Sequence, residues 1–294
     1  MDRIRRFALG LLCLGLWGWI AATPASAHYT VDGMEHEINV ALPPNFIART
    51  VVSGFTLPTD MVILPSGDFL VAEKGVGQAA FSKAQVRLVR GGVLQPGAVL
   101  TLGVNTLEDS GLLGIVLDPQ FAANQYFYVW YSTGEGSLGW NGTTYNRLSR
   151  FTFDPVTGTA DAASETIILD KVTWSSIHNG GGLAFDDQGN LLITTGDAGS
   201  DYNFPATHLA QSLKSLNGKV LRIRPRAAGG YDVPSDNPYV GNNQGYLPEI
   251  YAAGLRNPFR IARHVASNQL YLVDVGQETW EEANLIVAGA NYGW

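Results

Sequence analysis

The feature that most constrains the fold is a repeated phrase of a short apolar run, a tight turn and a second apolar run. In its first copy, residues 61–64 and 69–72 are rich in β-branched and other apolar side chains, and Pro65-Ser66-Gly67-Asp68 separates them. Runs bounded by Gly, Pro, Asp and Asn in this way are typical of β-hairpins. Similar phrases predict three more hairpins, at 114–131, 183–195 and 259–273.

The spacing of the four hairpins favours an all-β propeller. They recur at intervals of about 50 to 80 residues, as blades with insertions do, and a single blade cannot bury both of its faces alone. No stretch shows a sustained helical period, and the best helical candidate, residues 206–216, is expected to be a single turn or a loop. A β-sandwich or a jelly roll stays open as an alternative, because hairpin spacing does not separate these folds.

The N-terminus predicts a secretory signal over residues 1–27. Residues 1–6 are basic, residues 7–22 are apolar, and Ala25-Ser26-Ala27 has small residues where a signal peptidase cleaves. A retained membrane anchor is less favoured, because the apolar run is shorter than the ~20 residues of a membrane span and no stop-transfer charges follow. We therefore expect one mature domain, residues 28–294, in the periplasm or secreted.

Cysteine usage and charge narrow the choice of partners. The only cysteine, Cys13, lies in the predicted signal, so the mature chain has no disulfide. A domain of roughly 265 residues has a large enough core to need none. The net charge of −7, with only 19 Lys and Arg residues, argues against nucleic acid, which requires a basic face. A small molecule or a protein is the expected partner.

Two glycine-containing segments in the first part of the chain could contribute chemistry, since a rigid β-scaffold presents function on its loops. Residues 108–114 bring acidic side chains to the start of a hairpin, where a simple Asx or Ser turn would explain them equally well. In the second segment, His178 precedes Asn179 and three glycines. A histidine beside such an open backbone is a candidate general base, although a lone histidine is more often structural.

Two later segments could bind anions or a metal ion. Arg256 and Asn257 stand side by side before a proline, where they could bind carboxylates or carbonyls, or form only an internal salt bridge and a turn. Residues 274–282 and the closing Asn291-Tyr292-Gly293-Trp294 gather carboxylates and loop carbonyls. Oxygen ligands of this kind suit Ca²⁺, although acidic loops are commonly just solvated.

Taken in order, the motifs GLLG, HNGG, TGD, LRNP, DVGQ and NYGW resemble the soluble glucose/sorbosone dehydrogenases that use pyrroloquinoline quinone (PQQ), from about Phe55 to Trp294. The resemblance implies a six-bladed β-propeller with PQQ and Ca²⁺ in its central cleft. It also implies oxidation of an aldose at its anomeric carbon to the lactone, by hydride transfer to the quinone. The implied partners are the aldose and a periplasmic electron acceptor.

The resemblance further implies roles for single residues. His178 matches the general base, and Arg256 and Asn257 match residues beside the reducible quinone carbonyls. Asp109 takes the place of a glutamine that contacts cofactor and sugar, and is assigned to cofactor binding. Four positions match ligands of Ca²⁺: the main-chain carbonyls of Gly276, Gln277 and Tyr292 and the side chain of Glu282.

The sequence also departs from the family pattern. Ile177 stands where the glucose enzymes have an acid before the catalytic histidine, so the imidazole loses one orienting partner, and Gly182 replaces a frequent arginine. Cationic groups for the cofactor's carboxylates are expected from sequence beyond NYGW, so we expect the propeller to be incomplete at its C-terminal end. A non-catalytic propeller that binds carbohydrate or protein, and a Ca²⁺-dependent lactonase-like hydrolase, are the alternatives.

Overall fold

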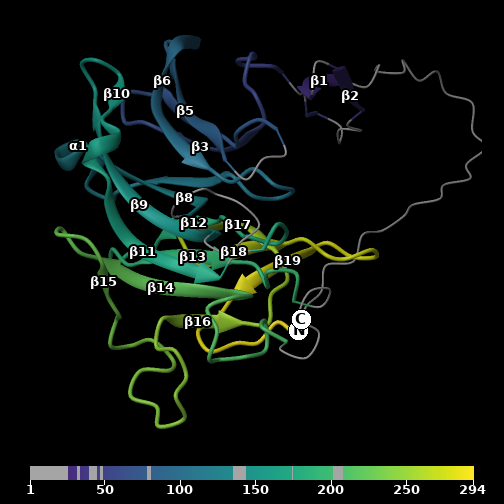
Figure 1. Cartoon of the computed structure of the whole chain (residues 1–294), viewed down its shortest axis with the longest axis vertical. Coiled ribbons are helices and arrows are strands. Elements are labelled where there is room, and N and C mark those ends of the chain that lie inside the picture. Colours follow the sequence, from purple (N-terminus) through teal and green to yellow (C-terminus); the bar gives the residue numbers. More distant parts are fainter. Residues whose placement is uncertain are drawn as a thin grey trace, which may run out of the picture.

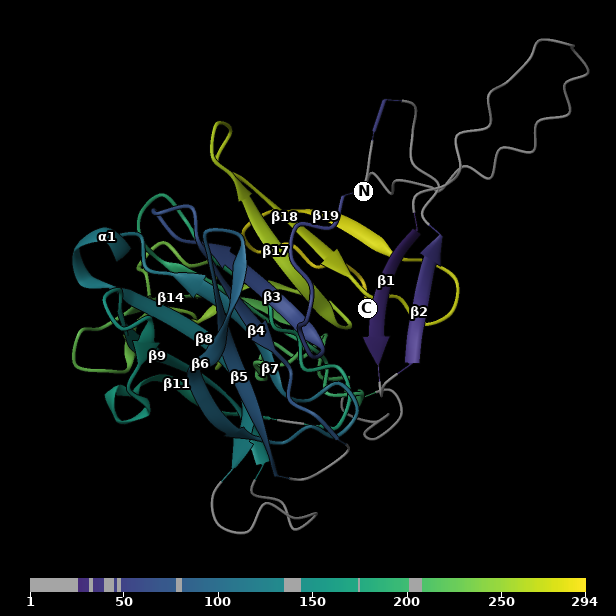
Figure 2. The same ribbon diagram turned by 90° about the horizontal axis from the view of Figure 1, so that it is seen from above.

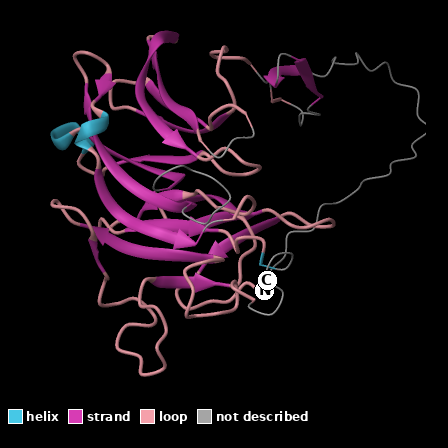
Figure 3. Cartoon of the chain, viewed as in Figure 1, coloured by secondary structure: helices cyan, strands magenta, loops and turns pink. Residues whose placement is uncertain are grey.

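The structure, a computed structural model, describes residues 26–31, 34–39, 45–46, 49–77, 81–134, 144–173, 175–200 and 208–294. Regular structure in these residues is almost entirely β-strand (Figure 3), apart from α1 (Phe121–Asn124) and a 3-10 turn at Ala162–Ser164. Residues 208–216 form turns, which confirms the expected loop for the described part of 206–216. No helix among the described residues is both long and apolar enough to cross a membrane.

Four antiparallel sheets follow one another along the chain as blades of a propeller (Figures 1 and 2). The first blade comprises β3 (Pro58–Ile63), β4 (Phe69–Glu73), β5 (Ser82–Arg90) and β6 (Val93–Val104). The second comprises β7 (Leu112–Leu117), β8 (Tyr126–Gly134), β9 (Thr144–Asp154), β10 (Thr159–Ala160) and β11 (Thr166–Thr173).

The remaining two blades complete the described fold. The third comprises β12 (Leu183–Phe185), β13 (Leu191–Thr195), β14 (Lys219–Pro225), β15 (Tyr231–Asp232) and β16 (Ile250–Ala253). The fourth comprises β17 (Pro258–His264), β18 (Gln269–Asp274) and β19 (Glu282–Ile286). A separate hairpin, β1 (Ser26–Val31) with β2 (Met34–Asn39), precedes them. Of the predicted secretory signal, residues 1–25 lie outside the described residues.

The four hairpins predicted from the sequence are confirmed as β3–β4, β7–β8, β12–β13 and β17–β18, each paired antiparallel. The all-β propeller is thereby confirmed in preference to a sandwich or a jelly roll. The resemblance implied six blades for the family and an incomplete set for this chain, and the described residues form four. These four already use residues 58–286, so no further blade can be built from this part of the chain.

The core consists of apolar layers between neighbouring blades. Strand β8 illustrates the principle: Phe127 and Val129 pack in the layer against the first blade, whereas Tyr128 and Trp130 pack in the layer against the third. Successive side chains of a strand point to opposite faces of its sheet, so a strand in an inner blade is buried on both sides. This burial explains why the inner strands of the second and third blades are apolar almost without interruption.

The fourth blade is covered on one face only. On β18, Leu270 and Leu272 pack against the third blade, whereas Tyr271 and Val273 are 49% and 48% exposed. Leu285 lies opposite Tyr271 on β19 and is also exposed. The strand therefore alternates between buried and exposed residues, as one-sided sheets do. No sheet in the described residues covers this outer face.

The third and fourth blades bring four loops together at one end. The HNGG segment leads into β12, and Thr195-Gly196-Asp197 leaves β13, at the same end of that hairpin. In the fourth blade, Arg256 and Asn257 lead into β17, and the loop from Val275 follows β18. The Asn257 side-chain oxygen accepts the N–H of Gly180 at 3.0 Å, which joins the two ends.

Candidate functional site

A histidine and an aspartate form the centre of this loop cluster. Nδ1 of His178 lies 2.7 Å from Oδ1 of Asp197, and both residues are buried. Since a carboxylate accepts and does not donate, Nδ1 carries the proton and Nε2 is left as an acceptor. A histidine held by a carboxylate in this way has the arrangement that general-base chemistry requires.

Asp197 is held from several directions. Its Oδ1 also accepts the N–H of Gly199 at 2.8 Å, and its Oδ2 accepts the indole N–H of Trp294 at 2.8 Å. Its own main-chain N–H donates to the carbonyl of Arg256 at 2.8 Å. Charge-assisted bonds of this kind fix a buried carboxylate in one orientation. Asp197 thus supplies the orientation of the imidazole that Ile177 cannot.

Asp109 supports the main chain of His178. Its Oδ2 accepts the N–H of His178 at 2.9 Å, while its own N–H donates to the carbonyl of Ser176. His178 has a φ of 59°, in the left-handed region that costs a non-glycine residue roughly 1–2 kcal/mol. The bond to Asp109 helps to hold this conformation. The structure therefore shows Asp109 in contact with the proposed base, whereas its predicted contact with a cofactor stays a prediction.

Arg256 and Asn257 are positioned by one carboxylate. Asp274 accepts their two main-chain N–H groups, at 2.9 Å and 2.7 Å. Burial raises the pKa of Asp274 to about 6, with a smaller contribution from the nearby charge of Glu282, while the two N–H groups act in the opposite direction. The aspartate of the DVGQ motif is thus a structural anchor for the LRNP motif.

The Arg256 side chain lies between the loop after β18 and the indole of Trp294. Its Nη1 donates to the carbonyls of Val275 and Gly276, at 3.0 Å and 3.1 Å, and its guanidinium carbon lies 5.4 Å from the centre of the indole ring. The buried Nε atom has no hydrogen-bond partner among the described residues. An unpaired buried donor of a cation is costly, so it favours an acceptor from a bound molecule.

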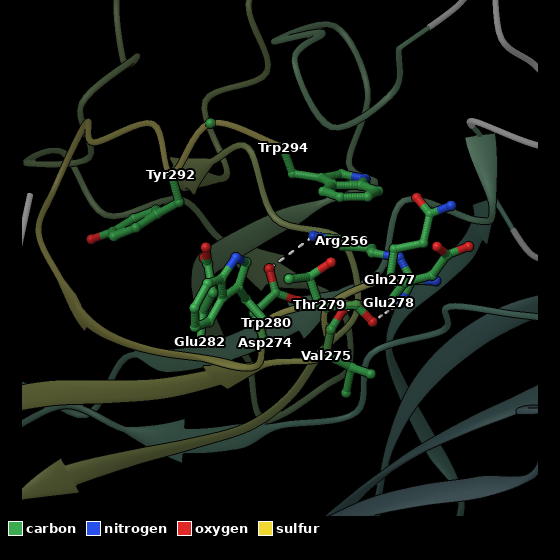
Figure 4. Close-up of a pocket in the computed structure, with 12 residues that line it drawn as sticks. Arg256, Asp274, Val275, Gln277, Glu278, Thr279, Trp280, Glu282, Tyr292 and Trp294 are labelled. Carbon is green, nitrogen blue, oxygen red and sulfur yellow. Dashed lines mark hydrogen bonds between the residues drawn. The ribbon is translucent and has the colours of Figure 1, made fainter. Parts of the chain in front are cut away.

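A pocket of about 360 Å³ opens beside Arg256 (Figure 4). Its size is within the usual range of small-molecule sites. It is lined by Arg256, Asp274, Val275, Gly276, Gln277, Glu278, Thr279, Trp280, Glu282, Tyr292, Gly293 and Trp294. All four predicted metal positions therefore border one pocket together with Arg256. His178, Asn257 and Asp109 do not line it. Asp197 joins His178 to Trp294 of the pocket wall, Asp274 of the wall accepts the main-chain N–H of Asn257, and Asp109 accepts the N–H of His178.

The oxygen atoms around this pocket supply some, but not all, of the ligands that a hard cation such as Ca²⁺ requires. Asp274, Glu278 and Glu282 contribute carboxylates around a single guanidinium, so the pocket is acidic and rich in oxygen. The carbonyl of Gly276, however, already accepts from Arg256. Within the described residues no group of three or more His, Cys, Asp or Glu side chains is close enough to bind a metal ion by itself. Further oxygen ligands would have to come from the main chain, from water or from a bound molecule.

Two roles were not predicted from the sequence, those of Asp197 and Trp294. Both residues stand in motifs that the sequence displays, TGD and NYGW. An acidic residue directly after a buried strand, between glycine and alanine, was the available signal for Asp197. Its pairing with an indole 97 positions away could not be inferred, because it depends on how the third and fourth blades pack.

Comparisons with known proteins identify the family of the chain. The profile of the family "Glucose / Sorbosone dehydrogenase" matches residues 55–294. The uncharacterized Synechocystis protein slr1608 is 30% identical over 88% of this chain and 61% of its own length. The aldose sugar dehydrogenase YliI of Escherichia coli is 31% identical over 70% of this chain and 54% of its own length.

A solved structure extends the comparison to the fold. The PQQ-bound form of the aldose sugar dehydrogenase from Streptomyces coelicolor is 29% identical with a TM-score of 0.64, over 85% of this chain and 65% of that one. The chain thus spans less than two thirds of the length of each of these three proteins. Family profile, relatives and fold lead to the same assignment, and this chain belongs to the glucose/sorbosone dehydrogenase family.

Proposed function

We propose that this chain contains the catalytic centre of a PQQ-dependent aldose dehydrogenase. Family membership supports the proposal, as does the likeness to two aldose sugar dehydrogenases, one of which is solved with PQQ bound. The structural observation on which it depends most is the hydrogen bond between His178 and Asp197, beside a pocket that Arg256 lines.

The reaction requires a base at the anomeric hydroxyl of the sugar. Asp197 keeps the proton of His178 on Nδ1, so Nε2 can accept the hydroxyl proton. The imidazolium that forms is stabilised by the same carboxylate. As the O–H bond breaks, the hydrogen on the anomeric carbon leaves as hydride, and the carbon–oxygen bond becomes the carbonyl of the lactone. The sugar thereby loses one proton to His178 and one hydride, and the hydride carries away the two electrons of the oxidation.

PQQ, when bound, supplies the acceptor for that hydride. Among the residues of the chain, Arg256 would hold it, because its Nε is buried without a partner and its positive charge suits an anionic quinone. The three carboxylates of the pocket would repel the anionic quinone unless a cation neutralised them. We therefore propose that Ca²⁺ binds together with PQQ, with Glu282 and the carbonyls of Gln277 and Tyr292 as its ligands. The carbonyl of Gly276 would join them through its second lone pair, since the bond from Arg256 occupies only one.

The N-terminal sequence pattern indicates the compartment in which the protein acts. A basic start, an apolar run and a small-residue cleavage site support export, so we propose that the protein acts in the periplasm or is secreted. An electron acceptor in that compartment would then reoxidise the cofactor.

Titration of the protein with PQQ tests the binding part of this proposal. In the presence of Ca²⁺ the quinone absorbance should change to saturation, and a chelator should reverse the change. Arg256→Gln should weaken binding by at least about tenfold, the effect of one lost charged hydrogen bond. Arg226→Gln, on an exposed arginine paired with Asp232, is the matched control and should bind as the parent does. Absence of any spectral change with folded protein at tens of micromolar would refute the proposal.

A further inference from the structure

A completely buried lysine lies beneath the site. Lys219 begins β14 and has no exposed surface. Its Nζ donates three hydrogen bonds to main-chain carbonyls, those of Leu209, Ala210 and Asn217, at 2.9 Å, 2.8 Å and 2.6 Å. An ammonium group has three N–H donors and no acceptor, so this set matches it fully. A buried cation is tolerated only when its donors are satisfied in this way.

All three acceptors belong to residues 208–218, here called the clamped loop. It consists of turns rather than regular structure, and the main-chain hydrogen bonds within it join only residues close in sequence, such as that from Gln211 N–H to the carbonyl of His208. The carbonyl of Ala210 also accepts the N–H of Gly254 at 3.0 Å, next to the LRNP motif. The N–H of Gly218 and the amide of Asn217 donate to the carbonyl of Gly196, the neighbour of Asp197. Lys219 thus binds a loop that is itself hydrogen-bonded to the residues preceding Arg256 and Asp197.

A continuous set of contacts leads from the clamped loop to His178. Gln211 and Asn291 exchange two side-chain amide bonds, at 3.0 Å and 2.7 Å, and Gln211 also donates to the carbonyl of Trp294. The N–H of Trp294 donates to the carbonyl of Gly254, and its indole N–H donates to Asp197. The position of the indole therefore depends on the clamped loop, and the carboxylate that holds His178 depends on the indole.

We propose that Lys219 is a positioning residue for the catalytic pair. Its ammonium group fixes the clamped loop, and the loop, through Gln211 and Trp294, sets the carboxylate of Asp197 against His178. Hydrogen-bond networks carry energetic coupling between separate sites, and these bonds form one from Lys219 to Asp197. The catalytic consequence rests on the proposed function, whereas the effect on Trp294 does not.

Lys219→Met tests the inference, because it keeps an unbranched side chain and removes the three donors. The comparison is made below about pH 7, where Lys219 of the folded protein carries its third proton. The indole N–H resonance of Trp294, identified by its loss in Trp294→Phe, should move toward that of a solvent-exposed indole. Amide hydrogen exchange in residues 208–218 and 289–294 should accelerate at least about tenfold, as expected for a lost charged hydrogen bond. Lys214→Met, on an exposed lysine of the same loop, is the matched control and should change neither signal. An unchanged Trp294 resonance in folded Lys219→Met overturns the proposal.

A surface variant tests the relay even if Lys219→Met does not fold. Gln211→Ala removes the exposed link to Asn291 and leaves the lysine in place. It should shift the Trp294 resonance while exchange near Leu209 stays slow. If the Trp294 resonance stays where it is, the relay through Gln211 is wrong.

The catalytic consequence is measured by steady-state kinetics with an aldose and PQQ. Lys219→Met should lower kcat at least about fivefold and change KM little, and this loss should disappear in a Trp294→Phe background, because coupled residues are not additive. Additive losses in the double variant would show that Lys219 does not act through the indole. A protein that shows the Trp294 shift but oxidises no aldose would instead refute the proposed function and leave the clamp intact.

Discussion

Asp197→Asn should separate catalysis from cofactor binding. Three donors converge on this buried carboxylate, from His178 and Gly199 on one oxygen and from Trp294 on the other. An asparagine side chain accepts on one side and donates on the other, so one set of donors must face an N–H group. Either the indole or the imidazole loses its partner, and in both cases the negative charge that stabilises the imidazolium is lost.

The size of the effect follows from these contacts. A hydrogen bond to a charged group contributes about 1.5–3 kcal/mol, and ~1.4 kcal/mol is a tenfold change in rate. We therefore expect kcat to fall at least about tenfold. If the amide donates to Nδ1, the proton of His178 moves to Nε2 and the base is lost, so the fall approaches the ~10⁴-fold limit of general-base catalysis. Asp197 does not line the pocket, so the affinity for PQQ should change by less than about threefold.

Steady-state kinetics and a PQQ titration on the same preparations measure both quantities. Asp187→Asn is the matched control, since it makes the same chemical change at an exposed aspartate in the turn after β12. It should leave kcat and binding unaltered. A folded Asp197→Asn protein with a turnover within twofold of the parent would refute the role given to the His178–Asp197 bond.

Substitutions at three other residues extend the test. His178→Ala should lower turnover by ~10²- to 10⁴-fold in steady-state kinetics and leave PQQ binding intact in a titration. Near-normal turnover would reject His178 as the base. Asp109→Ala should lower kcat about three- to tenfold, because the N–H of His178 loses its acceptor. Asp109→Asn keeps an acceptor, so its kcat should stay close to that of the parent. Equal losses of kcat in both variants would contradict this role. Burial lowers the pKa of Lys219 from 10.5 to about 7, so between these values the unfolded chain binds more protons than the folded one. The free energy of unfolding of the parent, relative to that of Lys219→Met, should therefore rise between pH 7 and 10 by at most about 1.4 kcal/mol per pH unit. Urea denaturation curves measure it, and a difference that does not change with pH would contradict the prediction.

The hairpins were predictable because turn residues and strand residues alternate sharply at them. Asp186 and Gly189 in the turn, with Leu191 and Ile193 after it, give an unambiguous local signal. Strands such as β9 gave none, since they contain charged residues whose partners lie elsewhere in the fold. Arg147 of this strand pairs with Asp170, and Arg150 donates to the carbonyl of Ala227. Such positions become favourable in a strand only once the tertiary structure has formed.

The site was predictable as a set of motifs but not as a geometry. Grouping the four metal positions beside Arg256 follows from the family resemblance, and the structure places them around one pocket. The contact between Arg256 and the Gly276 carbonyl was not predictable, because it arises from the packing of the LRNP segment against the loop after β18. The same holds for Asp109, whose bond to His178 joins the second and third blades.

The most direct test of the central claim is anaerobic reduction of the bound quinone by an aldose. Protein reconstituted with PQQ and Ca²⁺ should convert one equivalent of aldose to the lactone for each quinone reduced, followed by the absorbance of the quinone. His178→Ala, loaded to the same extent, should be slower by at least about a hundredfold. The account would be contradicted if the quinone bound by the parent protein stayed oxidised in excess aldose, or if both proteins reduced it at the same rate.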